Sequence, residues 1–84
     1  MKITNEIRAL NRAVTLFSRE MRLKLELKAR QGVTGWDYAG FLPDLKDKLH
    51  QHAEGKYEGD NLIDIANLAM FVWMLQKDSK QDGA

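Results

Sequence analysis

Arginines have the most distinctive placement in this 84-residue sequence, since all five lie before position 31. On a helical wheel that advances about 100° per residue, they fall within roughly 80° of one another. Each guanidinium group offers a permanent charge and a planar fork of donors that suits phosphates and carboxylates. The sequence therefore predicts one basic stripe, made of Arg8, Arg12, Arg19, Arg22 and Arg30.

Several uses of this stripe are compatible with the sequence. It can be a solvated polar face, a source of salt bridges between subunits, a contact for an acidic protein surface or a contact for nucleic acid. Nucleic acid is disfavoured because no aromatic residue interleaves with the arginines for base stacking, and because the rest of the chain is acidic. We expect a protein partner, with Trp36 in the next segment supporting the fold or lining the contact.

A second pattern consists of acidic and amide residues three positions apart, Asp44 with Asp47 and Asn61 with Asp64. Such pairs share a helix face, and two of them on adjacent helices could surround a Mg²⁺ ion with oxygen ligands. The pattern resembles the Glu-x-x-Glu and Glu-x-x-Asp motifs of MazG-type all-α nucleotide pyrophosphohydrolases. That resemblance implies a Mg²⁺-dependent hydrolase with Asp44, Asp47 and Asp64 as ligands, although this chain has shorter aspartates and Asn61 in place of a carboxylate. In the alternative interpretation, Asp44 and Asp60 lie at helix N-termini, where the helix dipole favours a carboxylate. The chain then has no metal, no cofactor and no catalytic residue.

The arginines belong to a first helix that we expect to begin at Thr4 or Asn5 and to run without Gly or Pro until Gly32. Its apolar residues recur every three or four positions, which places them on one stripe. A helix of about 27 residues is about 40 Å long, so it needs a partner along its whole length. This apolar stripe contains Ile7, Leu10, Val14, Phe17, Met21 and Leu25.

The segment 32–40 contains three glycines and predicts a loop, with Trp36, Tyr38 and Phe41 folded back onto the core. A second helix is expected from near Pro43 to just before Gly55. A third helix is expected from an Asp60 cap through Leu75. We therefore predict one helical domain over residues 1–77 and a flexible polar tail over 78–84.

The third helix is apolar nearly all round, apart from Asp64 and Asn67. These two residues predict either a thin solvent-facing stripe or a buried polar network. Three short helices can hardly enclose so apolar a helix, so we predict an all-α, three-helix protomer that forms a dimeric helical bundle through the third helix and part of the first.

The charges support association as well. The net charge is +1, but residues 1–31 carry eight Lys or Arg against three Glu, a balance of +5, and residues 32–84 carry five Lys against nine Asp or Glu, a balance of −4. Opposite signs in the two halves suggest either an external polar partner or compensation within the fold or the oligomer.

The segment Gly35-Trp36-Asp37, and later Asp64-Ile65-Ala66-Asn67-Leu68, resemble a pattern in small helical proteins of bacteriophages and prophages. The resemblance implies a phage origin and, by analogy, a noncatalytic binding or regulatory protein that engages a host enzyme. The chain lacks cysteine and any apolar run near the roughly 20 residues that a bilayer requires. We therefore expect a cytoplasmic protein, in the host cytoplasm if it is phage-encoded, without membrane contact.

Overall fold

A computed structural model describes residues 2–82, and it is built from three α-helices and one short 3-10 helix, η1. The helices are α1 (Lys2–Arg30), α2 (Leu42–Glu54) and α3 (Gly59–Asp82), with η1 (Ala39–Phe41) before α2. No strand occurs in the described residues. The all-α class, the three helices and the long first helix are therefore confirmed.

The first helix begins earlier than predicted, because Lys2 is already helical and Thr4 and Asn5 lie inside the first turns rather than at the cap. Its end is well specified. Val33 N–H donates to Lys28 O and Gly32 N–H donates to Ala29 O, each at 3.0 Å, and Gly32 has a φ of 89°. This paired closure around a left-handed residue is the Schellman motif, which glycine adopts at little steric cost.

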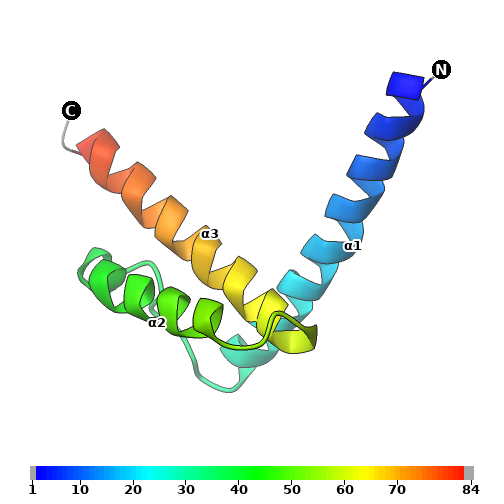
Figure 1. Cartoon of the computed structure of the whole chain (residues 1–84). Helices are drawn as coiled ribbons and strands as arrows, with labels where there is room; N and C mark the ends of the chain where they lie inside the picture. The colour runs from blue at the N-terminus through cyan, green and yellow to red at the C-terminus, as the bar shows by residue number, and fades with distance from the viewer. Residues whose placement is uncertain (1, 83–84) are drawn as a thin grey trace.

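Helices α2 and α3 form an antiparallel hairpin (Figure 1). Pro43 lies in the first turn of α2 and Gly55 follows its last residue, as the sequence predicted, although Gly55 is extended rather than left-handed. The third helix begins at Gly59, one residue before the expected cap, and continues to Asp82. Of the predicted polar tail over residues 78–84, residues 78–82 are helical, and residues 83–84 lie outside the described residues.

The loop between α1 and α2 contacts α3 through one pair of aromatic rings. The rings of Trp36 and Phe71 stack with centroids 4.8 Å apart and an interplanar angle of 18°. Tyr38 packs edge-on against Phe41 within the loop, and both rings remain exposed. Trp36 thus reaches α3 through one stacked ring but stays 40% exposed, so its predicted return to the core is met only in part. The predicted packing of Tyr38 and Phe41 on the core is wrong, because both rings are exposed and contact each other.

The first and third helices meet in one region and then diverge toward the two ends of the chain (Figure 1). The radius of gyration is 15.3 Å, against about 12 Å for a compact domain of this length. Only Leu45 and Leu75 are buried apolar residues in the described part of the chain. The N-terminal half of α1 therefore projects without the partner that its length requires.

No helix in the described part of the chain combines the length and the apolarity needed to span a lipid bilayer.

Candidate protein-binding surface

The five arginines lie on one side of α1, and all five are exposed. Because α1 is a continuous helix, the stripe expected from the wheel becomes a physical surface, which we call the arginine face. Among the side chains of residues 2–77, none of these guanidinium groups forms an ion pair. The arginine face is thus available to another molecule. It consists of Arg8, Arg12, Arg19, Arg22 and Arg30.

Within the chain, lysines rather than arginines of α1 form the ion pairs with the acidic remainder. Lys24 Nζ lies 2.6 Å from Asp64 Oδ1, and Lys28 Nζ lies 3.8 Å from the same oxygen. Lys24 also donates to the backbone carbonyl oxygen of Asp60 at 3.4 Å. The basic first helix and the acidic remainder therefore do compensate each other, but through a side of α1 that leaves the arginines free.

Three leucines flank the arginine face on α1 and are also exposed: Leu16, Leu23 and Leu27. They recur after seven and four residues, which places them on one ridge of the helix. Protein interfaces combine apolar area with arginine, whereas a phosphate backbone is gripped by charge and hydrogen bonds. The combination of arginines and exposed leucines favours a protein partner over nucleic acid.

Trp36 has a structural role in the protomer. Its stacking on Phe71 ties the loop to α3, and 40% of its surface remains accessible. Gly35, directly before it, has a φ of 86°, a conformation that favours glycine at this sharp turn. Trp36 lies outside α1, so any role at the contact would add to the arginine face rather than form part of it.

The residues of the acidic pattern do not form a common site. Asp64 turns toward α1 and is engaged by Lys24, whereas Asp44 and Asp47 lie on the exposed side of α2. Within the described residues, no group of three or more His, Asp or Glu side chains is arranged to hold a metal ion. The geometry therefore lends no support to the magnesium-site alternative.

Asn67 lies at the α1–α3 contact and is 5% exposed. Its Nδ2 donates to Met21 O at 3.4 Å, while its Oδ1 has no hydrogen-bond partner among the described groups. Asn67 and the half-buried Asp64 therefore face α1 rather than solvent, so the solvent-facing stripe is wrong, but no hydrogen bond between these two side chains joins them into a network. The sequence left these two alternatives open, because the side of α3 that α1 covers is set by long-range packing.

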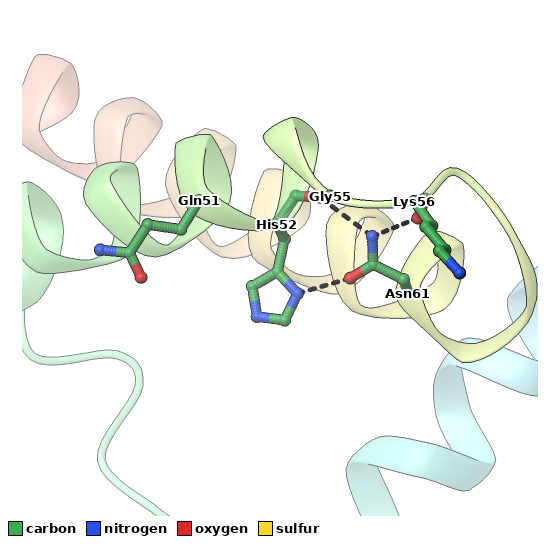
Figure 2. Close-up of a pocket in the computed structure, with 5 residues that line it drawn as sticks. All are labelled: Gln51, His52, Gly55, Lys56 and Asn61. Atoms are coloured by element: carbon green, nitrogen blue, oxygen red, sulfur yellow. Dashed lines mark hydrogen bonds between the residues drawn. The ribbon is translucent and has the colours of Figure 1, made fainter.

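Asn61 has a role that the sequence did not indicate. Its Oδ1 lies 2.8 Å from His52 Nδ1, and its Nδ2 donates to His52 O at 2.9 Å and to Lys56 O at 2.6 Å (Figure 2). These bonds close the α2–α3 turn beside a solvent-open depression of about 340 Å³ that Gln51 and Gly55 also line. The amide at position 61 therefore acts as a structural clamp between the end of α2 and the start of α3.

Searches of family models, curated proteins and solved structures found no match to this chain.

Proposed function

We propose that this chain is a noncatalytic binding or regulatory protein whose arginine face docks on an acidic surface of another protein. The observation that carries the proposal is the exposure of all five arginines on one side of α1, without an ion pair among the side chains of residues 2–77. Arginine suits this role because its fork of donors binds carboxylates in a bidentate manner.

The pattern around Trp36 and Asp64 that resembles small phage proteins supports a bacteriophage or prophage origin. On that basis the partner is a host protein, such as an enzyme, and the chain acts in the host cytoplasm. A small protein without an evident catalytic cluster can still regulate an enzyme by occupying an acidic surface on it.

The protomer is also proposed to self-associate. Its apolar core is small, and its radius of gyration exceeds that of a compact domain of this length. A dimer would cover apolar surface that one chain leaves exposed and would present two arginine faces to the partner.

The test is affinity capture from a bacterial lysate with two charge-matched variants. Arg12→Glu with Arg19→Glu reverses two charges on the arginine face, and Lys46→Glu with Lys48→Glu reverses two exposed charges on α2. We expect a captured protein that the wild type and the lysine variant retain and the arginine variant loses. Circular dichroism checks that each variant is folded. Equal capture by both variants would contradict the proposal.

Two further measurements separate the other function classes. Incubation with nucleoside triphosphates and Mg²⁺ should release no pyrophosphate, and release would support the hydrolase. Binding to DNA or RNA that weakens steeply with salt, and that the arginine variant lacks, would instead identify a nucleic-acid-binding protein.

A further inference from the structure

The N-terminal half of α1 carries an apolar ridge on the side of the helix opposite the arginines. We call it the N-terminal ridge. Its residues alternate spacings of four and three, which is the repeat of a helix–helix seam. Every member is exposed, from 42% for Phe17 to 75% for Ile3. The ridge consists of Ile3, Ile7, Leu10, Val14 and Phe17.

The same series continues into the part of α1 that already packs on a helix. Its next positions are Met21 and Lys24, which are half-buried and contact α3 through Asn67 and Asp64. Toward the N-terminus of α1, the two helices diverge (Figure 1). The ridge from Phe17 back to Ile3 therefore faces solvent. The side of α1 that receives α3 at one end therefore lacks a helix at the other.

The exposed area is sufficient for a stable dimer. The accessible surface is 6886 Å², whereas a compact monomer of 9.7 kDa exposes about 5,100 Å². The excess is about 1,800 Å², and a specific interface of standard size removes about 800 Å² from each partner. This excess belongs to the whole open protomer, and covering the exposed ridge would remove part of it.

Charge indicates which molecule covers the ridge. Its flanking positions are neutral or acidic apart from Lys2 at its start, so an acidic partner would find one cation there against the five of the arginine face. Two copies can meet along this side while their arginines point away from each other. The flanks are formed by Thr4, Asn11 and Ser18 on one edge and by Glu6, Ala13 and Glu20 on the other.

We propose that the N-terminal ridge pairs with the same ridge of a second copy in a two-fold contact between α1 helices. The inference rests on the self-association proposed above and moves its centre from α3 to α1. A ridge that pairs with itself satisfies the requirement that a two-fold interface uses the same patch on both subunits.

Single cysteines test this contact directly, because the natural chain has none. A cysteine replaces each ridge residue in turn, and Arg12→Cys and Thr15→Cys serve as controls on the opposite side. Disulfide formation requires Cα atoms within about 7 Å, so we expect at least one ridge variant to cross-link about tenfold faster than both controls. The set of reactive ridge positions then distinguishes parallel from antiparallel helices.

A charge substitution provides the second measurement. Val14→Glu should convert the dimer to a monomer in sedimentation experiments, while Thr15→Glu, with the same added charge one residue later, should leave it dimeric.

A dimer that survives Val14→Glu, or that cross-links through Trp73→Cys on α3 and not through the ridge, would overturn the ridge contact alone. A monomeric wild type without cross-links would overturn self-association as well. The arginine variant of the capture experiment should remain dimeric. Loss of partner binding can therefore be distinguished from loss of the dimer.

Discussion

At the scale of single residues, Asn61 determines how α2 is joined to α3. Its Nδ2 atom donates to two backbone carbonyl groups, so its Oδ1 atom is the acceptor facing His52. The Nδ1 atom of His52 must then carry the proton of that hydrogen bond. One amide thereby fixes both the turn and the tautomer of the neighbouring imidazole.

Replacing Asn61 with alanine should lower the free energy of unfolding by about 1–3 kcal/mol, because it removes the bonds that join the half-buried His52 to the start of α3. Urea unfolding followed by circular dichroism measures the change. Gln51→Ala is the control, since Gln51 lines the same depression but is exposed. Equal stability of the two variants would show that water replaces the clamp without cost.

Asn67 illustrates the opposite situation, a buried acceptor without a donor among the described groups. Asn67→Leu should raise the free energy of unfolding by about 1 kcal/mol, because an apolar side chain carries no desolvation cost for an unpaired oxygen. Thermal and urea unfolding test the sign. A less stable leucine variant would indicate that Oδ1 has a partner in the assembled protein.

Among the elements, α1 is joined to α3 by polar contacts. Lys24 and Asp64 are both half-buried, so their attraction is screened less than that of a surface pair. This pair lies where the two helices meet.

Asp64→Asn should therefore lower the free energy of unfolding by about 1–3 kcal/mol, because it leaves Lys24 partly buried without a counter-charge. Asp44→Asn, on the exposed side of α2, should change it by less than about 0.5 kcal/mol. Chemical unfolding at low ionic strength compares the two variants. Similar losses in both would mean that net charge, rather than this contact, sets the stability.

The boundaries of α2 and the Gly32 end of α1 were predictable, because Pro43, Gly55 and Gly32 act through local backbone geometry. The clustering of the arginines was predictable for the same reason, since helical periodicity is local. The sequence did not predict that Lys24 pairs with Asp64, or that Asp44 lies apart from Asp64. Both depend on which sides of distant helices meet, and a single sequence does not encode that in any short pattern.

At the scale of the whole molecule, the protomer is an open arrangement in which one long helix reaches beyond its core. The principal extents are 47 × 34 × 27 Å, and the N-terminal half of α1 contributes no buried residue. Stability of such a molecule is expected to come in part from association, because a chain of this size buries only about 60% of its unfolded surface even when compact.

The midpoint of thermal unfolding should therefore rise with protein concentration, as mass action requires when the folded state is a dimer. Differential scanning calorimetry over an about 100-fold range of protein concentration measures this. Val14→Glu should show no such dependence. A midpoint of the wild type that stays constant would indicate that the protomer is stable alone.

The single crossing between α1 and α3 also has a kinetic consequence. The clamp at Asn61 joins residues nine positions apart, whereas the bond from Asn67 to Met21 spans 46 positions. Closing the longer loop costs more chain entropy, so the α2–α3 hairpin should form first and α1 should dock on it last. In the native protein the reverse step is the detachment of α1 as a unit. Its amide hydrogens should then exchange with solvent before those of the hairpin do.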